Sequence, residues 1–182
     1  MTVAYNDIHR EIIELSKAGN AKAQYQLYQL YSKAMFNICI RMLNTFEEAE
    51  DLLQEAFTEA FTKLSSFRYE SSFGAWLKRI VINRCINAIK KRKADLVLSE
   101  DMGNYDAADN KDDDNIEYDV KRVHKAIEML PEGYRVIFSL YMLEGYDHSE
   151  IAQIMGISES TSKSQYMRAK LKLKEIIKAS MS

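Results

Sequence analysis

Proline and glycine are scarce in this chain of 182 residues, which holds one proline and six glycines. A β fold with many tight turns uses more of both, so their scarcity favours helices. No apolar run approaches the roughly 20 residues that a membrane-spanning helix needs, and the first residues lack the apolar core of a signal peptide. We therefore predict an all-α cytoplasmic protein without membrane insertion.

Residues that carry catalysis or bind metals are also few. Cys39 and Cys85 fall inside helical patterns without metal or redox spacing, and are interpreted as reduced, small apolar residues. His9, His124 and His148 are far apart in sequence and show no ligand spacing. No glycine-rich phosphate-binding loop is present. We predict no catalytic, metal or cofactor site, and thus no enzyme.

Charge is unevenly distributed along the chain, although the formal net charge is only −2. Residues 95–119 hold ten acids and one base, a net of −9, so the remainder carries +7. A segregated acidic stretch can mask basic surface that binds nucleic acid. Its few apolar residues show no sustained period, which predicts a flexible linker. The run Asp112–Asp114 lacks the spacing and glycine of a calcium loop, so a solvated charge run is the better interpretation.

Helical periodicity dominates the rest of the chain. Apolar residues recur at helical spacing in 8–18, 21–43, 49–64, 73–92, 120–129, 132–143, 147–155 and 159–177. Residues 65–72 break the pattern and are predicted to form a loop. We predict two small helical domains on a tether: an N-terminal helix at 1–20, a helical domain at 21–93, an acidic linker at 94–119 and a second helical domain at 120–182.

The second domain contains the layout of a helix-turn-helix. A short helix at 149–155 is followed by Gly156, which can take the positive φ of a helix exit, and then by Ser158 or Ser160 as a cap. The next helix is basic and polar, and Lys163, Gln165 and Arg168 are types that bond base edges and phosphates. An ordinary helical hairpin with a solvated, lysine-rich face is the alternative.

The helix at 73–92 is the second candidate for nucleic-acid binding. Between Ser71 and Lys93 there are seven bases and no acid. One stripe of this helix holds Arg79, Asn83, Asn87 and Lys90. The adjoining loop supplies Phe67, Arg68 and Tyr69, which suit stacking against an unstacked base. A solvated face on a core helix is the alternative for the stripe.

The helix at 49–64 has the opposite character. Its polar side holds Glu47, Glu48, Asp51, Gln54, Glu55 and Glu59. An acidic face of this kind suggests a basic protein partner, paired through charge and a modest apolar patch. An ordinary solvated face is equally compatible with the physics.

Three motifs in correct order resemble the sigma factors of the extracytoplasmic-function class. Residues 48–57 (EAEDLLQEAF) resemble their polymerase-binding segment, and residues 73–83 (FGAWLKRIVIN) resemble their promoter-melting segment. Residues 130–138 (LPEGYRVIF), Glu144–Tyr146 and the helix-turn-helix resemble their second conserved domain. The resemblance covers about 20–90 and 120–178, and it implies a factor that directs promoter recognition, DNA melting and transcription initiation.

The resemblance also implies a role for individual residues. Contacts with the clamp helices of the largest subunit of core RNA polymerase would come from Asp51, Leu52, Gln54 and Glu55, with Phe57 either joining them or lying in the core. Contacts with the −10 element of promoter DNA would come from Phe67, Arg68, Tyr69, Arg79, Asn83, Asn87, Lys90 and Lys91. Contacts with the −35 element would come from Ser160, Thr161, Lys163, Ser164, Gln165, Arg168 and Lys172. An anti-sigma factor is a further partner common in the family.

Two departures from the family pattern concern promoter preference. Asn87 occupies a position where the family often has Asp, and Ser160-Thr161-Ser162 replaces the usual Gly-Thr-Val. Ser162 places a hydroxyl where the family usually buries a methyl pair, which is expected to weaken packing of that domain. A conventional helix-turn-helix regulator that acts without polymerase remains the alternative function, and an adaptor that sequesters a partner on the N-terminal helices is a third.

Overall fold

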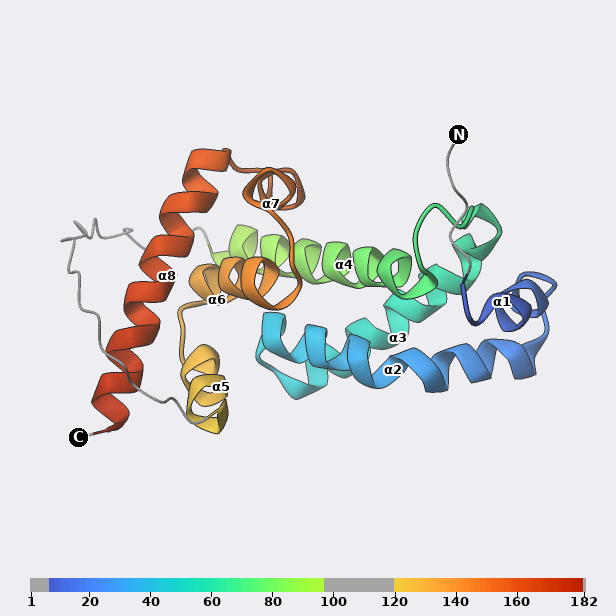
Figure 1. Cartoon of the computed structure of the whole chain (residues 1–182), viewed down its shortest axis with the longest axis horizontal. Coiled ribbons are helices and arrows are strands. Elements are labelled where there is room, and N and C mark those ends of the chain that lie inside the picture. Colours follow the sequence, from blue (N-terminus) through green and yellow to red (C-terminus); the bar gives the residue numbers. More distant parts are fainter. Residues whose placement is uncertain (1–6, 97–119, 182) are drawn as a thin grey trace. The chain divides into compact units, whose positions relative to one another are not determined.

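The computed structural model describes residues 7–96 and 120–181, and every regular element in these two ranges is helical (Figure 1). The chain divides into two compact units, the first ending at Lys91 and the second beginning at Arg92. The prediction of an all-α fold is confirmed. The acidic segment expected to be a linker lies outside the described residues from 97 onward.

The first unit is built from four helices, α1 (Arg10–Lys17), α2 (Ala21–Leu43), α3 (Phe46–Lys63) and α4 (Phe73–Leu96), of which α4 continues past the boundary of the unit at Lys91. The Asn20 side chain begins α2 by accepting a hydrogen bond of 3.0 Å from the Ala23 amide. Asn44 ends α2 with a φ of 59°, in the left-handed region that Asn tolerates at a helix exit. α1 and α3 both pack against α2, and α3 is followed by a 3-10 turn at Leu64–Ser66.

Each helix of this unit turns one apolar face inward, as the helical spacing predicts. The predicted stripe of α3 is buried, from Ala49 through Ala60, and Phe57 is a core residue that is 2% exposed. Phe57 lies edge-on to Tyr28 of α2, with ring centroids 4.8 Å apart. The start of α4 contributes Phe73, which is fully buried. Its ring packs against that of Tyr31, with centroids 5.1 Å apart. The helices expected at 8–18 and 73–92 form, although α4 extends through the first three residues of the expected linker, 94–96.

The two cysteines meet in this core, although the sequence offers no spacing that links them. Cys39 of α2 and Cys85 of α4 are both free and fully buried. The neighbouring Cys39 thiol, together with burial, raises the pKa of Cys85. The prediction that both behave as small apolar residues is consistent with this burial.

The second unit comprises α5 (Val120–Glu128), α6 (Glu132–Phe138), α7 (His148–Met155) and α8 (Glu159–Ser180). A π-helical turn at Ser139–Leu143 follows α6, so the segment expected as one regular helix at 132–143 changes its hydrogen-bonding pattern halfway. α5, α6 and α7 all pack against α8. The core of the unit is formed by Ile127, Leu130, Val136, Ile137, Leu140, Ile151, Tyr166, Leu173 and Ile177.

Candidate nucleic-acid interface

The predicted helix-turn-helix is formed by α7, a tight turn and α8. Asp147 caps α7 by accepting from the Glu150 amide at 2.8 Å, while Glu150 accepts in return from the Asp147 amide at 2.9 Å. Gly156 ends α7 with a φ of 69°, the left-handed conformation that glycine adopts without steric cost. Ser158 then caps α8 through a hydrogen bond of 3.0 Å from the Thr161 amide. This settles which of the two candidate serines is the cap.

The residues expected to read the −35 element all lie on α8. Most of these side chains are exposed, namely Ser160, Thr161, Lys163, Ser164 and Lys172, while Gln165 and Arg168 are half-buried. The opposite face of α8 enters the core through Tyr166, Ala169 and Leu173. α8 therefore presents a polar, cationic face to solvent, which is the geometry that a recognition helix requires. Contact of these residues with DNA stays a prediction.

The hydroxyl of Ser162 is satisfied inside the domain. Ser162 is fully buried on α8, and its Oγ lies 2.9 Å from Nδ1 of His148, the first residue of α7. The imidazole stacks on Tyr141 with ring centroids 4.5 Å apart. The Tyr141 ring in turn packs against Tyr166, with centroids 4.4 Å apart. This hydrogen bond offsets the cost of burying the serine hydroxyl. The family pattern alone gave no sign of such a partner.

α4 presents the predicted stripe on its solvent side. Arg79, Asn83, Asn87, Lys90 and Lys91 are all exposed. The opposite face of the helix is buried through Leu77, Val81, Ile82, Cys85, Ile86 and Ile89. The two cations of the stripe, Arg79 and Lys90, and the neighbouring Lys91 are therefore available to a polyanion, and the two amides lie among them.

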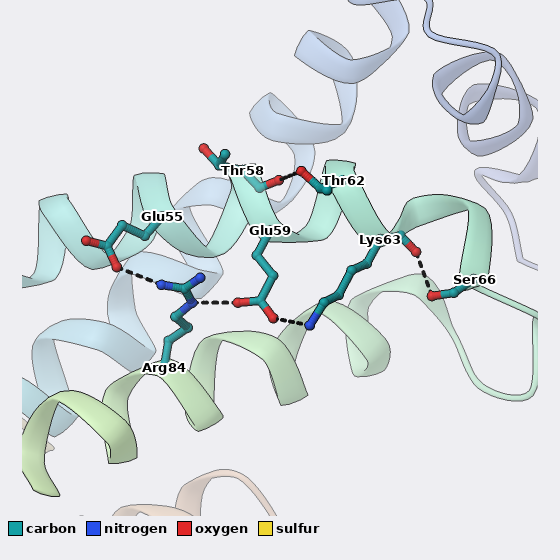
Figure 2. Close-up of polar contacts among 7 residues, drawn as sticks. All are labelled: Glu55, Thr58, Glu59, Thr62, Lys63, Ser66 and Arg84. Carbon is teal, nitrogen blue, oxygen red and sulfur yellow. Dashed lines mark hydrogen bonds and ion pairs between the residues drawn. The ribbon is translucent and has the colours of Figure 1, made fainter.

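Arg84 is turned away from that stripe toward α3 (Figure 2). Its Nε donates to Glu59 at 2.5 Å and its Nη1 to Glu55 at 2.8 Å. Lys63 donates to the same Glu59 carboxylate at 2.6 Å, and the bonds from Lys63 and Arg84 lower the pKa of Glu59. One of the seven bases counted in this segment thus joins α3 to α4.

The loop between α3 and α4, residues 67–72, has a different exposure from the one expected. Phe67 is 3% exposed and Tyr69 is 6% exposed, whereas Arg68 is exposed. The centroid of the Phe67 ring lies 4.7 Å from that of Tyr69 and 5.3 Å from that of Trp76, so the three rings form one aromatic cluster. Both rings are covered in this structure, because burying them against each other removes apolar area from water, and their contact with an unstacked base stays a prediction.

The polar side of α3 remains open, with one exception among the four residues expected to contact polymerase. Asp51, Gln54 and Glu55 are exposed, while Leu52 is 7% exposed and belongs to the core. Gln54 donates a hydrogen bond of 3.1 Å to the Tyr28 hydroxyl of α2. Asp51 and Gln54 line an open depression of about 480 Å³ between α2 and α3, together with Phe36, Phe46 and Glu50 among others. Acidic groups and aromatic carbons share this surface.

The comparisons with known proteins agree with this geometry. The family model for Sigma-70 region 2 matches residues 27–94, and the one for Sigma-70 region 4 matches residues 121–173. The RNA polymerase sigma-H factor of Pseudomonas aeruginosa is 30% identical over 172 residues, covering 88% of this chain and 89% of the relative. The chain is an extracytoplasmic-function sigma factor. It directs promoter-specific transcription initiation together with core RNA polymerase.

Further relatives match most of the chain. The sigma factor SigW of Bacillus subtilis is 28% identical and covers 90% of this chain and 93% of its own length. The structure of the sigma factor RpoE from Bartonella quintana, in complex with the anti-sigma factor NepR, matches with a TM-score of 0.56. It is 27% identical and covers 85% of this chain and 96% of that chain. Within residues 7–96 and 120–181, the sigma factor has no helix long and apolar enough to cross a bilayer.

Proposed function

We propose that this sigma factor docks on core RNA polymerase through the polar side of α3. Asp51, Gln54 and Glu55 are exposed on one stretch of the helix beside the depression between α2 and α3. Their carboxylates and amide suit a basic partner surface, and the clamp helices of the largest subunit are the partner that the family resemblance implies. Glu55 holds Arg84 in the free protein, so docking through Glu55 competes with that ion pair.

We further propose that the two units bind separate promoter elements. The exposed stripe of α4 contacts the −10 element, and the exposed face of α8 reads the −35 element in the major groove. The observation that carries this assignment is the pairing of two cationic helix faces, each on its own compact unit and each backed by a buried face. Two weak footprints on separate units favour binding that depends on polymerase, since polymerase holds both units in place.

The first experiment adds the full chain to sigma-free core polymerase with a promoter library. We expect new transcripts that begin downstream of a shared motif. A conventional helix-turn-helix regulator would instead bind duplex DNA tightly without polymerase and yield no new transcripts. An adaptor that sequesters a partner would give neither specific DNA binding nor promoter-dependent RNA synthesis.

Changing the docking face tests the polymerase contact directly. The pair Asp51→Ala and Gln54→Ala should reduce co-purification with core polymerase about tenfold, because two polar contacts at the interface are lost. Helicity by circular dichroism should not change. The control pair Glu11→Ala and Gln26→Ala alters exposed residues of the same types on α1 and α2. Equal co-purification by both pairs would argue against docking through α3.

The remaining assignments follow from this role. The RpoE relative was solved with an anti-sigma factor, which supports the proposal that this sigma factor also has an inhibitory protein partner. We place its site of action in the cytoplasm, where bacterial polymerase and DNA meet. We assign it no catalytic role of its own, because its proposed contacts serve binding and strand separation.

A further inference from the structure

α1 holds the α3–α4 loop through side chains that lie far from the loop in sequence. Lys17 Nζ donates a hydrogen bond of 3.0 Å to the Phe67 carbonyl. The Tyr69 hydroxyl donates to Glu14 Oε1 at 2.5 Å. Just before α1, the buried carboxylate of Asp7 accepts from the Phe73 amide at 2.7 Å, which anchors the point where the loop enters α4. Backbone and side chain of the loop are thus held at three places.

Two cations of α1 also lie over the buried rings of the loop. The Arg10 guanidinium carbon is 4.4 Å from the Tyr69 ring centroid, and Lys17 Nζ is 4.6 Å from the same centroid. Lys17 Nζ also lies 5.7 Å from the Phe67 ring centroid. These distances fall within the range in which a cation is attracted by the face of an aromatic ring. α1 therefore covers the rings as well as bonding the loop.

Tyr69 adopts a backbone conformation that a bulky residue rarely takes by itself. Its φ is 57°, in the left-handed region, where Cβ crowds the backbone. Such strain persists only where the surroundings hold the residue in place, and it is concentrated at functional sites. The contacts from Glu14, Lys17 and Arg10 all converge on this side chain.

The bond between Tyr69 and Glu14 is expected to persist at all working pH values. Burial and the bond to Glu14 raise the pKa of Tyr69, so its hydroxyl remains a donor. The bond from Tyr69, followed by that from Lys17, lowers the pKa of Glu14, so the carboxylate remains an acceptor. The loop is therefore held by a charge-assisted hydrogen bond rather than by one that titrates near neutrality.

We propose that Asp7, Glu14 and Lys17 are positioning residues that preform the α3–α4 loop for promoter melting. This inference rests on the proposed function, with the loop contacting the −10 element as the family resemblance implies. In the held conformation, Arg68 and Glu70 are exposed while the rings are covered. The amide of Phe73 at the start of α4 is occupied by Asp7, and the amide of Ala75 is bonded to the Ser72 hydroxyl. The loop meets the melted strand through its exposed polar groups, with Arg68 as its cation, and the buried rings serve as its scaffold.

Preforming the loop lowers the cost of melting, because a loop that is already ordered loses less conformational entropy when it binds the unpaired strand. The opposite model is an inhibitory one, in which α1 must release the loop before Phe67 and Tyr69 can stack on a base. The two models predict opposite effects of loosening the hold. Preformation predicts weaker melting, whereas inhibition predicts stronger melting.

The test uses the full-length chain, sigma-free core polymerase and a promoter fragment selected with the wild-type chain. Strand opening is read as permanganate reactivity of the −10 thymines. Tyr69→Phe keeps the ring and removes only the hydroxyl, so we expect open complex to fall about tenfold from loss of one charge-assisted bond. Glu14→Ala should reduce open complex to a similar extent. Glu14→Gln keeps an oxygen that accepts the bond from Tyr69, so it should restore most of the open complex. Arg68→Ala should also reduce opening, because the exposed cation is lost.

Glu11→Ala is the matched control, since Glu11 is an exposed acid on the same helix. Polymerase co-purification should match the wild type in every variant used, and a thermal midpoint above the assay temperature shows that each variant remains folded. If opening is unchanged or raised in Tyr69→Phe and Glu14→Ala, preformation by α1 is wrong. If Glu14→Gln fails to restore opening, the bond to Tyr69 is not what positions the loop. A wild-type chain that yields no transcripts would instead refute the proposed function itself.

Discussion

A single hydrogen bond decides how one unusual residue of this sigma factor is accommodated. Ser162 replaces an apolar residue of the family pattern, and its buried hydroxyl meets the ring of His148. Ser139, also buried, has a hydroxyl without a partner among the described residues. The difference shows that burial alone does not tell whether a serine hydroxyl has a hydrogen-bond partner. For Ser162 that partner comes from a different helix.

Removing the Ser162 hydroxyl tests this bond. Ser162→Ala should lower the free energy of unfolding by about 1 kcal/mol, because the imidazole of His148 then loses its partner in a partly buried site. Urea denaturation followed by circular dichroism measures the change. Ser164→Ala, on the exposed side of the same helix, should stay within about 0.5 kcal/mol of the wild type. Equal values for the two variants would show that the buried bond contributes nothing.

The carboxylate of Glu59 gives the first unit a contribution to stability that depends on pH. Its bonds to Lys63 and Arg84 lower its pKa below the ordinary glutamate value of 4.5. Because the folded state favours the ionised form, this contribution is present above about pH 4.5 and is lost as pH falls through the lowered pKa. Glu59→Gln should therefore be less stable than the wild type at pH 7, by about 1 kcal/mol or less given its partial exposure. The difference, measured by urea denaturation from pH 7 to pH 3, should shrink toward acid.

At the scale of elements, α4 serves two purposes on opposite faces. Its inner face packs into the core and its Arg84 bonds to α3, while its outer face carries the exposed stripe. The buried face and the ion pairs fix the rotation of the helix about its axis. The helix therefore presents Arg79, Asn83 and Asn87 together with the two lysines that follow.

The stripe predicts how DNA binding depends on salt. Lys90→Ala with Lys91→Ala should weaken binding of the polymerase holoenzyme to promoter DNA and flatten its dependence on salt. The slope of log affinity against log salt should fall by up to about two units, one for each lost phosphate contact. Fluorescence anisotropy across a salt series measures it. Lys22→Ala with Lys125→Ala removes the same charge from exposed positions on α2 and α5 and should leave the slope unchanged.

At the scale of the whole molecule, charge is segregated along the chain. Residues 95–119 carry −9 and the remainder carries +7, so the acidic segment can compete with DNA for the cationic faces of the free protein. This segment lies outside the described residues from 97 onward, and the hypothesis rests on sequence alone.

Neutralising the centre of the acidic segment tests the competition. Asp112→Asn, Asp113→Asn and Asp114→Asn together should raise affinity for nonspecific duplex DNA several-fold at low salt, because part of the competing charge is removed. The gain should vanish at high salt, where screening weakens both interactions. Filter binding at two salt concentrations measures it. An unchanged affinity at low salt would remove the hypothesis.

Local patterns in the sequence were sufficient to predict the helices, the helix-turn-helix and the exposed stripe of α4. Each depends on the spacing of residues along one helix, or on capping groups within a few positions, and both are visible in one dimension. The buried stripe of α3 and the left-handed Gly156 were predicted correctly for that reason. Recognition of the family followed from three such local motifs in order.

Contacts between residues that are distant in the chain could not be predicted in this way. Glu14 meets Tyr69 across 55 positions and Asp7 meets Phe73 across 66, and no period relates them. The same holds for Cys39 with Cys85 and for the rings that close over Phe67. Whether an aromatic side chain is covered or free depends on which helix packs against it. Periodicity describes one helix at a time, whereas packing between helices determines which of its side chains remain available to bind.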